Sequence, residues 1–258
     1  VGVSAGVNQP DRDRATEASI AWQRTGLACA CLVGPLLVLT VWGQQRLATS
    51  AWTHAGEPVT VGLVQGNVDQ GQKWDAASAS AIFDSYLRLT REAIANGAQA
   101  VLWPESSTPF FFEEDPGAAN RIRDIARNAG VPILLGSDQI AAAPPAIGGG
   151  VGDRAVPPQP RKYYNAAFLV RADGSTGPVY RKMHLVPFGE YVPLKSLLFF
   201  VGPLVEAVSD FSAGEAVVLL PVRGHLLSTA ICYEIVYPDL VRQSVRDGSE
   251  LLTTITND

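Results

Sequence analysis

The sequence has few charged residues and few cysteines. Lys, Arg, Asp and Glu make up 17% of its 258 residues, against the ~25% of ordinary soluble domains. The net charge is −5 and no run of basic residues is present, so we expect no nucleic-acid binding, which needs clustered cations to neutralise phosphates. Three cysteines cannot form a disulfide scaffold. A hydrophobic fraction of 47% excludes a disordered chain.

The sequence also lacks the spacing of a metal site or a phosphate loop. Its three histidines, His54, His184 and His225, are scattered and no cysteine cluster accompanies them. The three glycines at 148–150 have neither the lysine nor the strand–helix context of a phosphate loop. We therefore expect no metal and no cofactor.

One long uncharged run lies near the start of the chain, at residues 25–43. At ~1.5 Å per residue it spans ~28 Å, close to the ~30 Å thickness of a bilayer's hydrocarbon core. Trp22 and Trp42 lie at its two ends, where aromatic rings favour the membrane interface. The run predicts a membrane span in preference to a cleaved signal peptide or a buried core helix. Arginines before the run favour a cytoplasmic N-terminal side.

This span divides the chain into four predicted parts. They are a polar N-terminal segment at 1–24, a transmembrane helix at 25–43, a linker at 44–57 and a large domain at 58–258. Because the chain starts at Val1 rather than Met and ends soon after an apolar run, we expect a fragment whose domain is truncated at its C-terminus.

Strands and helices alternate over the first half of the large domain. Apolar runs at 59–64, 101–103 and 133–135 predict buried strands, and periodic patterns at 76–96 and 120–128 predict helices between them. This order is typical of a layered α/β domain. Strands that are apolar throughout are usually covered on both faces.

Strands dominate the second half. Residues 141–160 are rich in Pro and Gly and predict a surface insertion. One more helix is predicted at 239–246. The remaining predicted strands are 164–170, 179–181, 217–222, 226–231 and 251–255.

Cys232 is a candidate nucleophile because it ends an apolar strand. A residue at that place is held by the sheet and exposed at its edge. The alternative is a buried core cysteine, but Glu234, two positions later, is a charge in a poor place for a core. Cys29 and Cys31 lie in the predicted span and are expected to be packing residues.

Two further candidates follow other strands. Glu105 comes after the strand at 101–103, at the edge where α/β sheets carry sites, and is either a general base or a solvated loop residue. Lys182 either stabilises an oxyanion and lowers a thiol pKa or is an ordinary exposed lysine. Glu190 and His184 are lesser candidates, and such a histidine more often packs a loop than forms a Cys–His dyad.

Two apolar runs follow these candidates, at 110–112 and 197–201. Consecutive apolar residues on a surface suggest docking on a bilayer or shelter for acyl chains. The alternative is that each run is a short core element. The sequence leaves both interpretations open.

The candidates occur in an order that resembles a known family. Trp-Pro-Glu-Ser at 103–106, Tyr-Arg-Lys at 180–182 and Ile-Cys-Tyr-Glu at 231–234 resemble the Glu-Lys-Cys pattern of the nitrilase (carbon–nitrogen hydrolase) superfamily. The stretch RKMHLVPFGEYVP at 181–193 is similar to one branch, the apolipoprotein N-acyltransferases, and so is the stretch at 61–74.

The resemblance implies a nitrilase-like α-β-β-α sandwich preceded by one transmembrane helix. It implies Cys232 as nucleophile, Glu105 as general base and acid, and Lys182 as oxyanion stabiliser. Supporting positions in the site are implied for Glu190, Glu234, Tyr233, Trp74 and Asn165. The implied location is the bacterial cytoplasmic (inner) membrane, in a multi-pass parent protein with the catalytic domain on the extracytoplasmic side.

The implied reaction moves the sn-1 acyl chain of a phospholipid, through a thioester on Cys232, to the α-amine of a diacylglyceryl-cysteine apolipoprotein. The partners are then the phospholipid donor, the apolipoprotein acceptor and the membrane, and we expect a monomer. Two other interpretations remain. One is a membrane-tethered carbon–nitrogen hydrolase (amidase or nitrilase) acting on a small substrate, and the other is an inactive tethered binding domain.

Overall fold

The computed structural model divides the chain into two compact units, Val1–Pro58 and Val59–Asp258. The structure describes residues 9–49, 56–68, 76–142, 161–191 and 211–257.

The first unit contains one long helix, α1 (Gln9–Thr49). Its stretch Trp22–Thr49 is long and apolar enough to cross a membrane, judged by length and composition. Large apolar side chains along this stretch are exposed, among them Leu36 at 63% and Val38 at 68%. A helix whose described apolar side chains are exposed on all sides is typical of a membrane span.

Helix α1 extends beyond the predicted span at 25–43 in both directions. It includes residues 9–24 of the predicted polar segment and 44–49 of the predicted linker. After Pro10 these two stretches carry neither Gly nor Pro, and they contain many strong helix formers. The physical boundary of the helix therefore lies outside the apolar run.

The second unit contains a five-stranded sheet with the order β1-β2-β3-β4-β5. The first three strands are parallel, with α3 (Ala76–Ala95) and α4 (Pro116–Ala129) between them in the chain, and the last two are antiparallel to their neighbours. The strands are β1 (Val61–Leu63), β2 (Ala100–Leu102), β3 (Ile133–Ala142), β4 (Arg161–Val170) and β5 (Thr176–Arg181).

A second sheet has the order β6-β7-β8. Strands β6 (Leu220–Val222) and β7 (His225–Ile231) are antiparallel, whereas β7 and β8 (Leu251–Ile255) are parallel. The short 3-10 helix η2 (Cys232–Val236) and α6 (Pro238–Arg246) connect β7 to β8.

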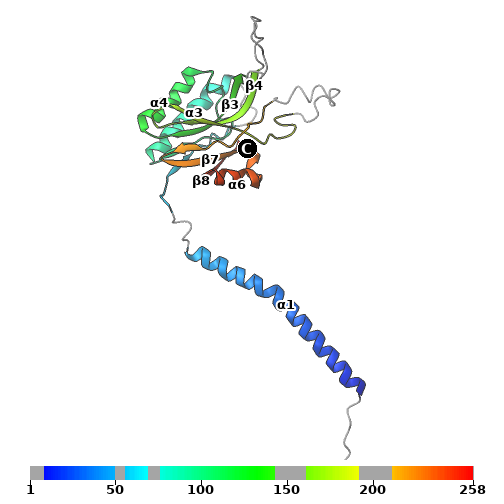
Figure 1. Cartoon of the computed structure of the whole chain (residues 1–258). Coiled ribbons are helices and arrows are strands. Elements are labelled where there is room, and N and C mark those ends of the chain that lie inside the picture. Colours follow the sequence, from blue (N-terminus) through cyan, green and yellow to red (C-terminus); the bar gives the residue numbers. More distant parts are fainter. Residues whose placement is uncertain (1–8, 50–55, 69–75, 143–160, 192–210, 258) are drawn as a thin grey trace, which may run out of the picture. The chain divides into compact units, whose positions relative to one another are not determined.

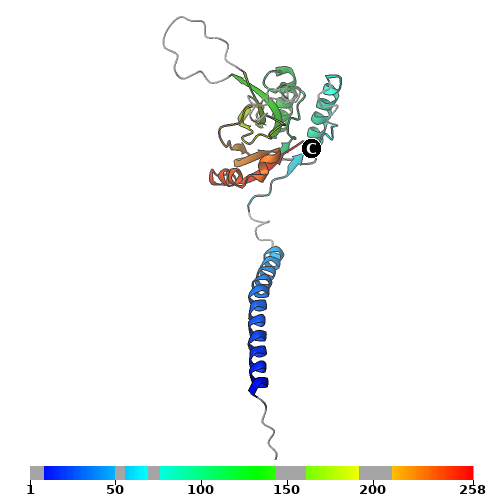
Figure 2. The same cartoon turned by 90° about the vertical axis from the view of Figure 1, so that its right-hand side faces the viewer.

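The two sheets face each other, with helices on their outer faces. Figures 1 and 2 show α3 and α4 against the first sheet and α6 against the second. The predicted α-β-β-α sandwich is confirmed. Side chains alternate between two cores along each central strand: Val101 and Trp103 point to the helix side, whereas Ala100 and Leu102 point between the sheets. This alternation explains why these strands are apolar throughout.

The first apolar run, Phe110 to Phe112, is a core element. Phe112 is fully buried and its ring lies 5.2 Å from that of Phe168, while the ring of Phe110 meets Phe83 edge-on at 4.9 Å. The core interpretation therefore holds for Phe110 and Phe112, whereas Phe111 is half-buried and its ring lies 6.3 Å from that of the exposed Tyr163. The second run, 197–201, lies outside the described residues.

Strands β4 and β5 begin three residues earlier than predicted, at Arg161 and Thr176, and β6 begins three residues later, at Leu220. Two further boundaries differ for identifiable physical reasons. Helix α4 begins at Pro116 rather than at 120, since the side chain of Asp115 accepts a hydrogen bond from Ala118 N (2.9 Å) and caps the helix. Strand β3 continues to Ala142, which pairs with Arg161 on β4. The predicted insertion thus begins after the strand, and residues 143–160 lie outside the described residues.

Candidate active site

Glu105 lies in a turn that follows β2 and is tied to β3. Gly136 N donates to Pro104 O (3.1 Å), and Ser107 N donates to Gly136 O (2.9 Å). Ser106 in the same turn has φ +41°, and its hydroxyl donates to Asp138 Oδ1 (3.0 Å). These contacts fix the direction in which Glu105 leaves the sheet.

Lys182 directly follows β5 and is one of the most buried residues, with an exposed fraction of 1%. Its backbone N donates to Asn165 O on β4 (2.8 Å), and its carbonyl accepts from Gly214 N (2.7 Å). The expectation of an ordinary exposed lysine is excluded. A buried ammonium needs partners, and it finds them in two carboxylates.

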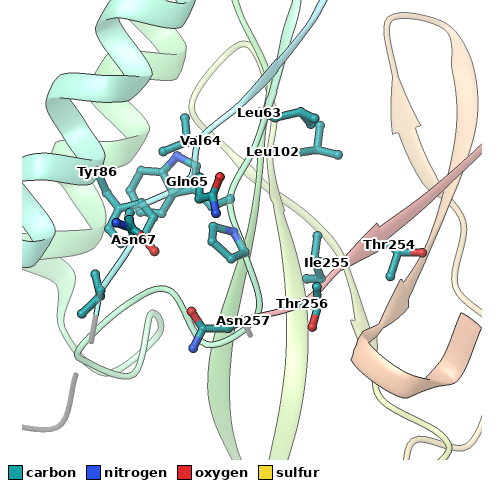
Figure 3. Close-up of a pocket in the computed structure, with 14 residues that line it drawn as sticks. Leu63, Val64, Gln65, Asn67, Tyr86, Leu102, Thr254, Ile255, Thr256 and Asn257 are labelled. Atoms are coloured by element: carbon teal, nitrogen blue, oxygen red, sulfur yellow. The ribbon is translucent and has the colours of Figure 1, made fainter. Parts of the chain in front are cut away.

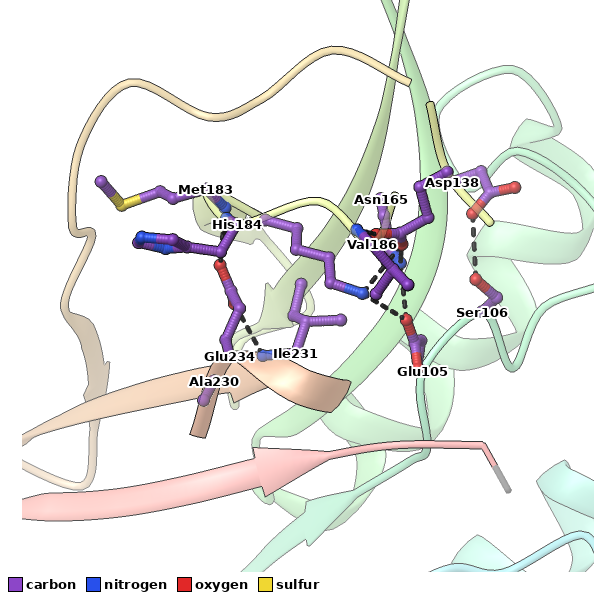
Figure 4. A network of polar contacts seen from close by, with 12 residues as sticks. Glu105, Ser106, Asp138, Asn165, Met183, His184, Val186, Ala230, Ile231 and Glu234 are labelled. Carbon is purple, nitrogen blue, oxygen red and sulfur yellow. Dashed lines mark hydrogen bonds and ion pairs between the residues drawn. The ribbon is translucent and has the colours of Figure 1, made fainter. Parts of the chain in front are cut away.

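Four side chains form a closed polar ring, which we call the site quartet: Glu105, Asn165, Lys182 and Glu190. Lys182 Nζ contacts Glu105 Oε1 at 3.3 Å and Glu190 Oε1 at 2.8 Å. Asn165 Nδ2 donates to the same two oxygens, at 2.6 Å and 2.9 Å (Figure 4). Each of the two donors thus contacts both acceptors, and both carboxylates are only 12–13% exposed.

The charge of Lys182 is fixed by these neighbours. Burial alone lowers the pKa of this lysine, but the negative charges of Glu105 and Glu190, with a contribution from Cys232, outweigh burial and raise the pKa above its ordinary value of 10.5. Lys182 is therefore an ammonium at neutral pH. An ammonium has three hydrogens, and the two carboxylates take two of them.

Glu190 belongs to a tight turn after β5. Its backbone N donates to Val186 O (2.9 Å), and its Oε2 accepts from Val186 N (2.8 Å). The turn thus occupies Oε2 of Glu190, while Oε1 is the oxygen that contacts Lys182 and Asn165 in the site quartet. From this turn, Glu190 Oε1 reaches the ammonium of Lys182.

Cys232 follows the end of β7 and is the first residue of η2. Its φ is +54°, a left-handed conformation that non-glycine residues seldom adopt and that often marks a functional site. The thiol is half-buried and interacts electrostatically with Lys182. The strand-end thiol thus packs against the edge of the core between the two sheets, near enough to the buried Lys182 to contribute to the raised pKa of that lysine.

Glu234 organises the backbone around both Cys232 and Lys182. It is fully buried, and its Oε1 accepts from Met183 N (2.6 Å) and His184 N (3.0 Å), while Oε2 accepts from Ile231 N (2.8 Å). Tyr180 Oη donates to both oxygens, at 3.0 and 2.9 Å. Burial and the charge of Glu234 raise the pKa of Tyr180, which keeps the phenol a donor.

The other predicted site residues are Tyr233, His184 and Trp74. Tyr233 is 56% exposed, next to Cys232. The ring of His184 stacks on Tyr237 with centroids 4.1 Å apart, which is the packing role rather than a dyad. Trp74 lies outside the described residues.

Sequence reasoning missed Tyr180 as a partner of Glu234. The signal was weak: in the Tyr-Arg-Lys stretch, Tyr180 and Lys182 lie two positions apart, so both point to the same side of a strand. Among the described residues no group of three or more His, Cys, Asp or Glu side chains could hold a metal ion.

A separate cavity of about 300 Å³ lies where β1, β2 and β8 end. Figure 3 shows it between Tyr86, Gln65 and Asn67 on one side and Thr256 and Asn257 on the other. Pro104 is part of its lining, so the cavity begins one residue before Glu105. The members of the site quartet do not line it.

The chain is similar to several groups of known proteins. Residues 60–258 match the model of the carbon-nitrogen hydrolase family. An apolipoprotein N-acyltransferase from Geobacter metallireducens is 40% identical over 86% of this chain and 40% of its own length. A protein of the same name from Rhizobium etli is 38% identical over 77% of this chain and 36% of its own length. Another, from Methylococcus capsulatus, is 33% identical over 88% of this chain and 41% of its own length. The chain thus spans about two fifths of these curated relatives.

Two solved structures share the fold. One is the NitN amidase from Neterenkonia sp. AN1, with a TM-score of 0.52 and 21% identity over 77% of this chain and 67% of that chain. The other is an amidase from Nesterenkonia sp., with a TM-score of 0.51 and 21% identity over 77% of this chain and 64% of that chain.

Proposed function

The chain belongs to the carbon–nitrogen hydrolase family, and we propose that it acts as the catalytic part of an N-acyltransferase. The donor is the sn-1 acyl chain of a phospholipid and the acceptor is the α-amine of a diacylglyceryl-cysteine apolipoprotein. The observation that carries the proposal is the 33–40% identity over most of the chain to proteins named apolipoprotein N-acyltransferase. The apolar stretch of α1 supports a site of action at a bacterial inner membrane.

In the first half-reaction Glu105 takes the proton of Cys232, and the thiolate sulfur attacks the ester carbonyl. Lys182 already contacts both carboxylates of the site quartet, and its third hydrogen stabilises the oxyanion of the tetrahedral intermediate. When the carbon–oxygen bond breaks, Glu105 returns the proton to the glycerol oxygen. A lysophospholipid leaves and the acyl chain remains on Cys232 as a thioester.

In the second half-reaction the α-amine of the apolipoprotein attacks the thioester carbonyl. The proton of the amine passes to Glu105 while Lys182 again stabilises the oxyanion. The carbon–sulfur bond breaks, the product is an amide, and the thiolate of Cys232 recovers its proton from Glu105. No cofactor takes part in this scheme.

The test uses the chain in liposomes that contain phospholipid labelled in the sn-1 acyl chain, without an amine acceptor. Mass spectrometry should find a labelled acyl adduct on the peptide that contains Cys232, and hydroxylamine should remove it. The Geobacter metallireducens relative, treated in the same way, serves as the reference for the assay. Adding a diacylglyceryl-cysteine peptide should then move the label to its α-amine.

Three results would contradict the proposal. A thiol that iodoacetamide alkylates quickly but that forms no adduct, while the reference does, indicates a hydrolase with a small substrate. If neither the labelled phospholipid nor iodoacetamide modifies Cys232, the chain is an inactive binding domain. An adduct on another residue would exclude Cys232 as the nucleophile.

A further inference from the structure

The cavity at the ends of β1, β2 and β8 lies beside the two groups that are proposed to perform the chemistry. Pro104, which lines the cavity, directly precedes Glu105. Ile255, which also lines it, is the register partner of Ile231 on the parallel strand β7, and Cys232 follows Ile231. The cavity therefore adjoins the proposed base on one side and the proposed nucleophile on the other, at the edge where α/β sheets bind ligands.

The described residues that line this cavity are all uncharged. They combine apolar side chains with hydroxyl groups and with three side-chain amides, those of Gln65, Asn67 and Asn257 (Figure 3). Each amide has both donor and acceptor groups, as a peptide group does. The side chains of Gln65 and Asn67 are exposed and have no hydrogen-bond partner among the described residues. Both amides are therefore available to a ligand.

The turn that carries these two amides is held in place by a buried aromatic pair. A Cβ added at Gly66 would lie 2.5 Å from Tyr86 Oη, so the backbone of the turn lies directly on the phenol. Tyr86 is 2% exposed, and its ring packs against Trp103 with centroids 5.1 Å apart. Asn67 has φ +48°, a left-handed conformation that asparagine tolerates better than most residues. The position of the turn is thus fixed by packing.

The lining distinguishes between the two substrates of the proposed reaction. A phospholipid headgroup contains a phosphate, which proteins bind chiefly with arginine and lysine, and no described lining residue has a cationic side chain. A peptide backbone is neutral and exchanges hydrogen bonds with side-chain amides in both directions. The volume of about 300 Å³ is at the lower end of the ~300–1,000 Å³ of ligand sites. It suits a short stretch of peptide.

We propose that this cavity binds the first peptide groups that follow the lipidated cysteine of the acceptor, and that Gln65 and Asn67 recognise them. The inference rests on the proposed acyl transfer, and it adds the place of the second substrate. With the peptide in the cavity, the cysteine that precedes it lies toward the edge where Glu105 and Cys232 follow their strands. The acceptor is then selected as a peptide, which separates it from amine-bearing phospholipids of the same membrane.

The test separates the two half-reactions. The chain in liposomes is first loaded on Cys232 with a labelled acyl chain from the phospholipid, without an acceptor. Two acceptors are then compared: a diacylglyceryl-cysteine peptide with several residues after the cysteine, and diacylglyceryl-cysteine amide, which has none. Mass spectrometry follows the loss of the label from the peptide that contains Cys232 and its arrival on each acceptor.

The variant is Gln65→Leu combined with Asn67→Gly, which removes both amides and respects the left-handed conformation at position 67. We expect it to be loaded at the wild-type rate. It should need about tenfold or more of the peptide acceptor for half-maximal transfer, as expected for two lost hydrogen bonds. Transfer to diacylglyceryl-cysteine amide should not change, because that acceptor has no residues to place in the cavity.

Gln243→Leu combined with Asn96→Gly is the matched control. It makes the same two replacements at exposed positions that do not line the cavity, on α6 and in the turn after α3. This control should behave like the wild type with both acceptors. If the variant at 65 and 67 does not fold, as judged by circular dichroism, the two single variants carry the test.

Two results would overturn the inference: unchanged transfer to the peptide acceptor, or equal losses with both acceptors. Slower loading from the phospholipid would also overturn it, since the cavity would then serve the donor. If even the wild type is not loaded, the acyl transfer fails, and photo-crosslinking decides the inference by itself. A diacylglyceryl-cysteine peptide with a photoreactive side chain after the cysteine should label residues 63–68 or 254–257. Labelling only outside these segments would contradict the inference.

Discussion

At the scale of single residues, the central fact is a lysine with almost no exposed surface between two carboxylates. Lys182 is 1% exposed and contacts Glu105 and Glu190. A buried ion pair of this kind is weak as a source of stability, but removing one partner leaves uncompensated buried charge. The same residues that are proposed to act on the substrate therefore also influence folding.

Lys182→Met should lower the free energy of unfolding at pH 7 by about 3–5 kcal/mol and abolish adduct formation on Cys232. In the wild type the pKa of Lys182 is raised, so its stabilisation is fully present below the ordinary value of 10.5 and is lost only as the pH rises through the higher folded-state pKa. Urea unfolding in detergent micelles at several pH values measures this.

Lys162→Met is the control for that substitution, because Lys162 lies on β4 outside the site quartet. It should change neither stability nor adduct formation by much. A Lys182→Met variant that unfolds like the wild type at every pH would contradict the account of the buried ion pairs.

Cys232→Ser should abolish the acyl adduct and lower the unfolding free energy by only about 1 kcal/mol. The reason is that the thiol is half-buried and lies at the end of β7. Cys29→Ser with Cys31→Ser, both exposed on α1, should leave the adduct intact. If Cys232→Ser does not fold, the alternative interpretation of Cys232 as a buried core cysteine would be supported instead.

At the scale of elements, the site depends on how closely β3 approaches the turn after β2. A Cβ added at Gly136 would clash with the carbonyl oxygen of Pro104 and lie 2.6 Å from Glu105 Cα and 2.8 Å from Ser106 N. All three are backbone atoms, which cannot turn away as a side chain can. The turn that carries Glu105 can therefore lie against β3 only because position 136 has no side chain.

Gly136→Ala should destabilise the chain by about 1–3 kcal/mol, as overpacking does, and should also slow adduct formation because the turn carrying Glu105 must move. Gly117→Ala on α4 is the comparison, since the nearest atom to its new Cβ lies at an ordinary 3.4 Å. That change should be neutral or slightly stabilising. Unfolding midpoints and adduct rates for both variants check the prediction, and equal effects of the two would contradict it.

At the scale of the whole molecule, a layered α/β unit and a helix apolar enough to cross a membrane belong to one chain. The exposed leucines and valines of this helix would be unfavourable in water, where large apolar surfaces are usually covered. A bilayer would surround the exposed apolar side chains of the described part of α1 with hydrocarbon. This arrangement agrees with the proposal that the acyl donor is a lipid.

Leu36→Arg combined with Val38→Arg should remove the chain from membranes. Each arginine at the centre of a span costs about 2.5–3.5 kcal/mol of insertion free energy. Gln44→Arg with Gln45→Arg, beyond the uncharged run, adds the same charge and should leave the chain in carbonate-washed membranes. If the first variant also stays in the washed membranes, α1 does not span them.

The sequence by itself determined the features that depend on neighbours along the chain. Uncharged length predicts the helix around 25–43, and β-branched runs such as 251–255 predict strands, because propensity and periodicity act over a few residues. The order of Glu105, Lys182 and Cys232 along the chain was enough for the family resemblance.

Only the tertiary structure decided how those residues meet. Glu105 is 60 positions from Asn165 and 77 from Lys182, so their contacts depend on the register of β3 against β4 and on where each strand ends. A shift of one residue in that register would turn Asn165 to the other face of the sheet. The shared carboxylate oxygens, the buried lysine and the closeness of Gly136 to the turn are products of packing, which no local pattern specifies.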